Sequence, residues 1–92
     1  SGAQLQGANL GFAKLSGANC SSADFSDCNL MFADLTDANL SGVNLRGAKL
    51  SGAVLNGTYL SGANLGGTDI GVADLGGAFL VGAVMPDGTL GK

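Results

Sequence analysis

An apolar residue recurs at every fifth position of this 92-residue chain, from residue 5 to residue 90. All 18 positions divisible by five carry Leu, Ile, Met, Phe or Cys, although only 46% of the residues are hydrophobic overall. A small residue stands two places before each of them, and it is Ala in 13 of the 18 units. The residue between the two is Asn or Asp in ten units, and the other two places are mostly Gly, Ser, Thr or Asp. The chain is therefore a tandem array with the consensus Ala-(Asn/Asp)-Leu-Ser-Gly.

A period of five fits neither a regular helix nor a flat strand. On an α-helix each step of five turns the side chain by about 500°, which would wind the leucines around every face. On a strand an odd period places successive leucines on opposite faces. Within one unit, however, a locally extended chain points the small residue and the Leu the same way, and the next two residues favour a turn. A bend of the same hand in every unit predicts an all-β coil with the small and large residues inside.

The units Ala38–Gly42, Ala63–Gly67 and Ala73–Gly77 resemble the A(D/N)LXX unit of pentapeptide repeat proteins, and the resemblance covers the whole chain. The closing segment Met85–Leu90 is similar to the end of many cyanobacterial members. The resemblance implies a single domain, residues 1–92, folded as a right-handed quadrilateral β-helix with four units per coil and about four and a half coils. We expect every position divisible by five, Leu90 included, and the residue two before it to point inward.

Composition bounds the partners. Seven acidic and four basic residues give a net charge of −3, which disfavours nucleic acid because phosphates need clustered Lys and Arg. The densest apolar stretch, residues 79–85, is far shorter than the ~20 residues of a membrane-spanning helix. We therefore expect neither a nucleic acid nor a membrane as partner. The repeat is already running at Ser1 with no leader sequence, so we expect the cytoplasm, or the periplasm or thylakoid lumen if a leader has been removed.

The sequence predicts no catalytic, cofactor-binding or metal-binding residue, and hence no enzyme. General acid–base catalysis recruits His or tuned carboxylates, whereas this chain has no His and spreads its Asp residues over outward and corner positions. Its Gly-rich segments follow the period and match no phosphate-binding loop. Cys20 and Cys28 fall on core positions, which predicts buried, reduced thiols on opposite walls of adjacent coils rather than a disulfide or a metal site.

Four units per coil would place residues 20 apart in one column. Lys14 then lies under Asp34 and Lys49 under Asp69, which predicts ordinary exposed ion pairs.

Two further columns are aromatic. Phe12 and Phe32 share a turn position that Gly usually holds, so they either pack along the coil wall or form part of a partner-binding stripe. Tyr59 and Phe79 share a position that Asn or Asp usually holds.

The C-terminal third departs most from the consensus. Besides Tyr59 and Phe79, Val84 replaces an Asn or Asp and Val81 replaces a Ser, all at outward positions. Only the turn formers around Pro86 interrupt the repeat after them, so we expect this end of the stack to leave backbone groups unpaired. These features predict self-association or a protein partner at the C-terminal coils, with Phe79 near the centre. The alternative is a patch that is covered by additional chain.

The function predicted from these observations is a structural or interaction scaffold without chemistry of its own. The alternative is a DNA-mimicking inhibitor of a type II topoisomerase such as DNA gyrase, an activity that the resemblance associates with longer family members. The short rod, the charge of only −3 and the lack of a visible C-terminal helical dimer module disfavour it.

Overall fold

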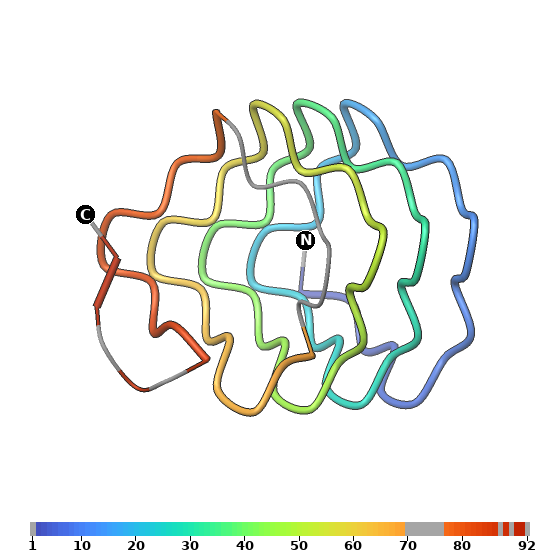
Figure 1. The fold of residues 1–92 in the computed structure, drawn as a ribbon, viewed down its shortest axis with the longest axis horizontal. Coiled ribbons are helices and arrows are strands. Elements are labelled where there is room, and N and C mark those ends of the chain that lie inside the picture. Colours follow the sequence, from blue (N-terminus) through green and yellow to red (C-terminus); the bar gives the residue numbers. More distant parts are fainter. Residues whose placement is uncertain (1, 70–76, 87, 89, 92) are drawn as a thin grey trace.

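The computed structural model describes residues 2–69, 77–86, 88, 90 and 91. There the chain winds into a stack of coils with principal extents of 27 × 26 × 22 Å (Figure 1). Parallel bridges join residues 20 apart along the stack, from Gln4 with Asp24 to Asn64 with Val84. This confirms the right-handed quadrilateral β-helix with four units per coil. The described residues form isolated bridges and turns, and none of them forms a helix long and apolar enough to cross a membrane.

Each unit that the structure describes in full ends in a β-turn. The turn is closed by the N–H of the small residue, as where Ala8 donates to the Leu5 carbonyl oxygen over 3.0 Å. The second turn residue has a left-handed backbone and the first does not, which is the type II geometry. Gly holds this second position in most units because a side chain there costs about 1–2 kcal/mol.

In a described unit with a coil on both sides, three further amides form hydrogen bonds between coils. The Asp24 N–H donates to Ala3 in the coil before, and the Phe25 N–H donates to Asn44 in the coil after, both over 2.8 Å. The second turn residue also donates forward, as Asp27 does to Arg46 over 2.9 Å. In a described unit that has a coil on both sides, only the amide of the first turn residue is left without a backbone acceptor.

The Asn or Asp side chain accepts that remaining amide. Its Oδ1 takes the N–H of the residue two places later, as Asn39 does from Ser41 over 3.0 Å. In units with a coil on both sides, such as Ala38–Gly42, all the amides are then paired, so the middle place of the unit favours Asn and Asp. The acceptors are Asn9, Asn19, Asp24, Asn29, Asp34, Asn39, Asn44 and Asn64.

Alternating large and small side chains fill the axis of the stack. The positions divisible by five from Phe25 to Leu65 are at most 1% exposed, and Ala, Cys and Val fill most small positions between them. Two small positions hold Thr58 and Thr68, whose hydroxyls donate over 2.7 Å to carbonyl oxygens of the preceding coil. Within the described residues no buried side-chain nitrogen or oxygen lacks a partner, as a stable interior requires.

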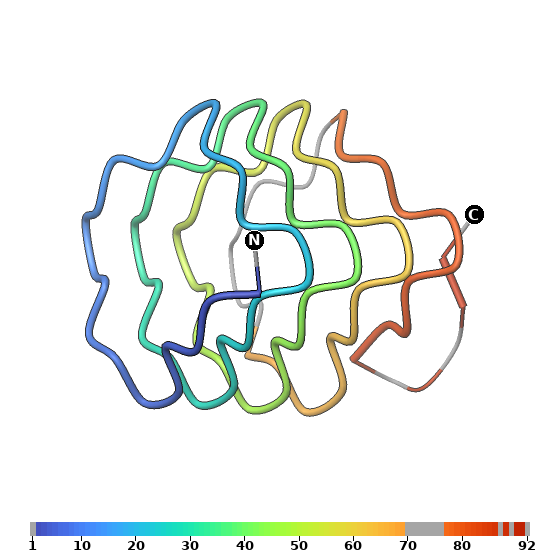
Figure 2. The ribbon, with the colours of Figure 1, turned by 180° about the vertical axis from the view of Figure 1, so that it is seen from behind.

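The prediction that Leu90 points inward is wrong. After Pro86 the chain turns back, and Leu90 bridges Val84 in antiparallel fashion and is 65% exposed (Figure 2). Gly91 donates its N–H to Ala83 and accepts the N–H of Gly82. The expectation of an open C-terminal edge therefore also fails in part, because this returning segment occupies groups that another coil would use.

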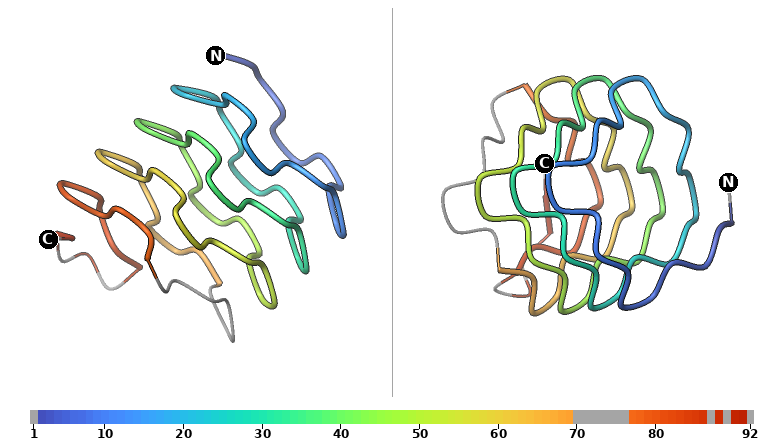
Figure 3. Two further views of the ribbon diagram at one scale, coloured as in Figure 1. Left: turned by 90° about the horizontal axis from the view of Figure 1, so that it is seen from above. Right: turned by 90° about the vertical axis from the view of Figure 1, so that its right-hand side faces the viewer.

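Burial also weakens at the other end of the stack. Leu5 is 38% exposed, and the large residues Leu10, Leu15 and Cys20 are half-buried, because the first coil packs on one neighbouring coil only (Figure 3). Cys20 is thus less buried than predicted, whereas Cys28 is fully buried. The inward positions predicted at 70, 73 and 75 lie outside the described residues.

Candidate interaction surfaces

The stack has four walls, each followed by a corner of two turn residues. We number the walls in chain order and identify each by the outward residues of its column. The first wall carries residues 4, 24, 44, 64 and 84, the second 9, 29, 49 and 69, the third 14, 34 and 54, and the fourth 19, 39, 59 and 79. The predicted columns of Lys14 with Asp34 and of Lys49 with Asp69 are confirmed by their parallel bridges.

The fourth wall carries the first aromatic column. The rings of Tyr59 and Phe79 stack with their centroids 4.9 Å apart and an angle of 10° between their planes. Each side chain is about half exposed, where the earlier coils of this wall carry Asn. Val81, 66% exposed, lies on the corner that follows, and Val84 lies half-buried on the first wall. We call these four residues the C-terminal apolar patch.

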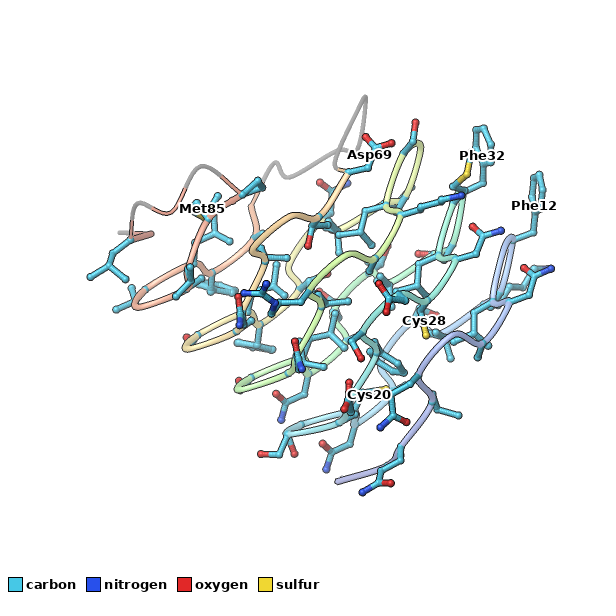
Figure 4. The ribbon with its side chains drawn as sticks, turned by 90° about the horizontal axis from the view of Figure 1, so that it is seen from below. Phe12, Cys20, Cys28, Phe32, Asp69 and Met85 are labelled. Atoms are coloured by element: carbon cyan, nitrogen blue, oxygen red, sulfur yellow. The ribbon has the colours of Figure 1, made fainter. Side chains whose placement is uncertain are left out.

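The second aromatic column lies at the corner after the second wall. The rings of Phe12 and Phe32 stack with centroids 5.1 Å apart and project from successive coils (Figure 4). Both residues have left-handed backbones, with φ of 62° and 63°, which is unusual for bulky side chains. The Phe32 ring lies over Gly52, where an added Cβ would come within 2.5 Å of it. An open hollow of about 270 Å³ lies beside the column. It is lined by Asn9, Gly11, Phe12, Asn29, Met31 and Phe32.

The two aromatic columns do not form one surface. The corner of Phe12 and Phe32 separates the second and third walls, whereas the corner of Val81 separates the fourth and first walls. In a four-walled coil these corners are diagonally opposite. The six residues predicted from the sequence therefore divide into the C-terminal apolar patch and a separate phenylalanine column.

Sequence reasoning missed a third feature, an open hollow of about 470 Å³ at the corner after the first wall. Arg46 and Asp27 occupy neighbouring turn positions there, in successive coils, and Gly47, Gly66 and Gly67 leave the space beside them empty. The signal was a pair of opposite charges 19 residues apart, which is visible only once the coil length is known. The hollow offers a guanidinium, a carboxylate and the hydroxyl of Ser26, and no His lines it.

Two carboxylates of the walls, Asp24 and Asp34, are held as turn acceptors. The amide of Ser26 lowers the pKa of Asp24, and the hydroxyl and then the amide of Thr36 lower the pKa of Asp34. Hydrogen bonds to the charged form cause this direction of shift. No group of three His, Cys, Asp or Glu side chains in the described ranges could hold a metal ion.

Burial instead raises the pKa of both thiols. The Cys28 sulfur also lies 2.8 Å from the carbonyl oxygen of Leu5, to which its S–H donates. Both cysteines are free, and neither thiol is in the electropositive surroundings that activate a nucleophile.

Comparisons of the sequence and of the structure with known proteins both find pentapeptide repeat proteins. A sequence profile described as pentapeptide repeats matches residues 3–42 and 38–71, with eight copies. A pentapeptide repeat protein from the thylakoid lumen of Arabidopsis thaliana is 31% identical over 88% of this chain, with a TM-score of 0.86. A pentapeptide repeat protein from the cyanobacterium Cyanothece 51142 is 32% identical over 89% of this chain, also with a TM-score of 0.86. Each match spans only 56% of the other protein's chain.

Two comparisons carry no argument about function. The plasmid-mediated fluoroquinolone resistance protein QnrB1 is 20% identical over 87% of this chain and 59% of its own, with a TM-score of 0.31. The comparison with curated protein sequences gave no match.

Proposed function

Because the chain belongs to the pentapeptide repeat family, we propose that it is a non-enzymatic scaffold whose rigid coils present an interaction surface to protein. The C-terminal apolar patch is the observation that carries this proposal. It replaces the Asn and Asp of the consensus with Tyr59, Phe79 and Val84, and at Tyr59 and Phe79 the unit thereby loses the side-chain acceptor that Asn39 provides one coil earlier. The apolar side chains therefore do not stabilise the turns of the coil, whereas their exposed surfaces are suited to contact with a protein.

The size of the patch supports a contact. Tyr59 and Phe79 leave about half of each ring exposed, and Val81 leaves two-thirds of its side chain exposed. Aromatic anchors in interfaces typically lose about 2 kcal/mol or more of binding free energy on truncation. Stacking holds the two rings in one orientation, so little side-chain entropy remains to be lost when a partner covers them.

Catalysis finds little support among the described side chains. Their carboxylates act as turn acceptors or lie apart on different walls, and the carboxylate beside the Ser26 hydroxyl, Asp24, has a lowered pKa, which makes it a weak base. Acidic side chains occupy the first, second and third walls, at Asp24, Asp69 and Asp34, without the dense row of charge that a DNA mimic needs. This distribution favours the scaffold over the topoisomerase inhibitor.

Sedimentation of the parent against the double variant Phe79→Ser, Val81→Ser tests the proposal. We expect the parent to associate, with itself or with an added partner, and the double variant to associate at least tenfold more weakly while it still melts cooperatively. Phe12→Ser is the matched control, because it removes an exposed ring from the opposite corner and Ser22 already adopts the required backbone. A parent that stays monomeric at high concentration and recovers no partner would refute the proposal.

A further inference from the structure

One face of the stack carries no charged residue in any coil. The fourth wall and the corner that follows it comprise residues 18–22, 38–42, 58–62 and 78–82, and none of them is Asp, Glu, Lys or Arg. We call this surface the uncharged face. Its outward side chains are Asn19, Asn39, Tyr59 and Phe79 along the wall and Ser21, Ser41, Ser61 and Val81 along the corner.

The other three faces all carry charges among the described residues. The first wall and its corner carry Asp24, Asp27 and Arg46, the second wall carries Lys49 and Asp69, and the third wall and its corner carry Lys14, Asp34 and Asp37. Charged side chains are thus present on every described face but one, in a protein whose net charge is −3. A polar repeat that solely required solubility would have no reason to avoid one wall.

We propose that the uncharged face binds a second copy of this chain, side by side and running in the same direction, about a twofold axis along the rods. This inference rests on the proposed function, because the C-terminal apolar patch supplies half of the contact. It adds the identity of the partner and extends the surface to the Asn and Ser residues of the first two coils.

Charge argues for a second copy. Two molecules of net charge −3 repel one another, and a twofold contact places equal residues opposite or near each other. On any charged face such a contact brings Asp close to Asp or Lys close to Lys. The uncharged face avoids this, so it is the described face best suited to contact with itself.

The area is sufficient for such a contact. The stack has four walls and two ends of similar extent, so one face is about a sixth of the accessible surface of 4483 Å², or about 750 Å², and a standard interface takes about 800 Å² from each partner. The parallel bridges Asn19–Asn39, Asn39–Tyr59 and Tyr59–Phe79 place one outward residue per coil along the wall, so two copies that run the same way present the same coil spacing to each other.

The direction follows from the two halves of the face. Its C-terminal half is apolar, with Tyr59, Phe79 and Val81, whereas its N-terminal half is polar. Rods that run the same way place rings against rings. The amide N–H groups of Asn19 and Asn39, whose Oδ1 atoms already accept turn amides, can then donate to Ser hydroxyls of the copy. Rods that run in opposite directions would bury polar groups against the rings, which is costly.

A charge placed on the polar half tests the inference separately from the apolar patch. Ser41→Asp puts a carboxylate on the uncharged face, and Ser51→Asp puts one at the same turn position on the diagonally opposite corner. Both serines are half-buried, so the two variants match in chemistry and exposure. In sedimentation equilibrium we expect Ser41→Asp to weaken the dimer at least tenfold and Ser51→Asp to leave it unchanged.

Mixing variants of opposite charge shows whether the two copies run in the same direction or in opposite directions. In the proposed dimer the two residues 41 lie at the same height on either side of the twofold axis, so an equimolar mixture of Ser41→Asp and Ser41→Lys should recover the dimer, while each variant alone remains weak. Recovery only when Ser41→Asp is mixed with Ser61→Lys would show opposite directions and overturn the inference.

The remaining outcomes separate this inference from the proposed function. A dimer that Phe79→Ser with Val81→Ser abolishes and Ser41→Asp leaves intact would refute the uncharged face as the interface and keep the patch as a binding site. A parent that is monomeric at every concentration, but binds a different protein through the patch, would also refute the second copy and leave the scaffold standing.

Discussion

Replacing Gly52 with Ala tests how the phenylalanine column is packed. Gly52 has φ of +76°, and a Cβ there would come within 2.5 Å of the Phe32 ring. Gly67 is the matched control, because its φ is +65° and its nearest neighbour to an added Cβ is at 3.9 Å. Both variants therefore place a side chain in a left-handed turn, but only Gly52→Ala also meets a ring.

The magnitudes follow from the cheaper way to relieve the clash. A left-handed Ala costs about 1–2 kcal/mol, which sets the expectation for Gly67→Ala. At Gly52 the half-exposed Phe32 ring can swing outward, and this loses its stack with Phe12, worth about 0.5–1.5 kcal/mol. We therefore expect Gly52→Ala to destabilise the protein by about 2–3 kcal/mol. Effects on the unfolded chain are alike for the two variants and cancel in the comparison.

Urea unfolding followed by circular dichroism measures both variants, alone and with Phe32→Ala. In the Phe32→Ala background the added cost of Gly52→Ala should fall to that of Gly67→Ala, because no ring remains to be displaced. Equal destabilisation by the two glycine variants in the parent would refute the packing of Phe32 over Gly52. A difference that survives in the Phe32→Ala background would locate its cause elsewhere.

Three further predictions follow from the core and the turns. Leu40→Asp should abolish cooperative thermal melting, because it buries an unpaired charge at a fully buried position; melting like that of the parent would contradict the inward assignment. Burial raises the pKa of both thiols, so a thiol reagent at pH 7 should label Cys28 slowly and the half-buried Cys20 faster. The Ser26 amide lowers the pKa of Asp24 below 3.8, so its stabilising effect is present above that pH and is lost as pH falls through the lowered value. Asp24→Asn keeps the acceptor and should make acid unfolding less steep.

The sequence predicted the interior well because the interior depends on local geometry. A unit such as Ala38–Gly42 contains its own turn, its own inward pair and its own side-chain acceptor, so period and residue type suffice to orient it. The four-unit coil was different. The number of units per coil was implied by the family resemblance, because the residues of one unit do not determine how many units complete one turn of the helix.

The failures concern contacts that lie beyond one unit. Leu90 satisfies the period, yet it bridges Val84 because the chain reverses after Pro86. Leu5 and Cys20 satisfy it too, but their coil has only one neighbour to bury them. Pairing of a chain with its own last coil is decided by tertiary structure, which a five-residue pattern does not encode.

The surface columns were predictable only as far as the coil length was known. Stacking of Tyr59 on Phe79 followed directly from a spacing of 20 residues. The separation of this column from Phe12 and Phe32 followed from the same number, but it needed the walls to be assigned. The hollow beside Arg46 is lined by residues of three successive coils. Its glycines gave no signal in the sequence, because Gly is expected at turn positions of the repeat.

The interior and the exterior of this protein repeat with different lengths, and this has a consequence for its evolution. Insertion of one five-residue unit would leave the alternation of large and small inward residues intact. It would nevertheless rotate all later outward residues by one wall, so that Phe79 would no longer stand on Tyr59. Gain or loss of 20 residues would preserve both. Genes for such chains should therefore change length by any multiple of five where only folding is selected, and by whole coils where a face is in use.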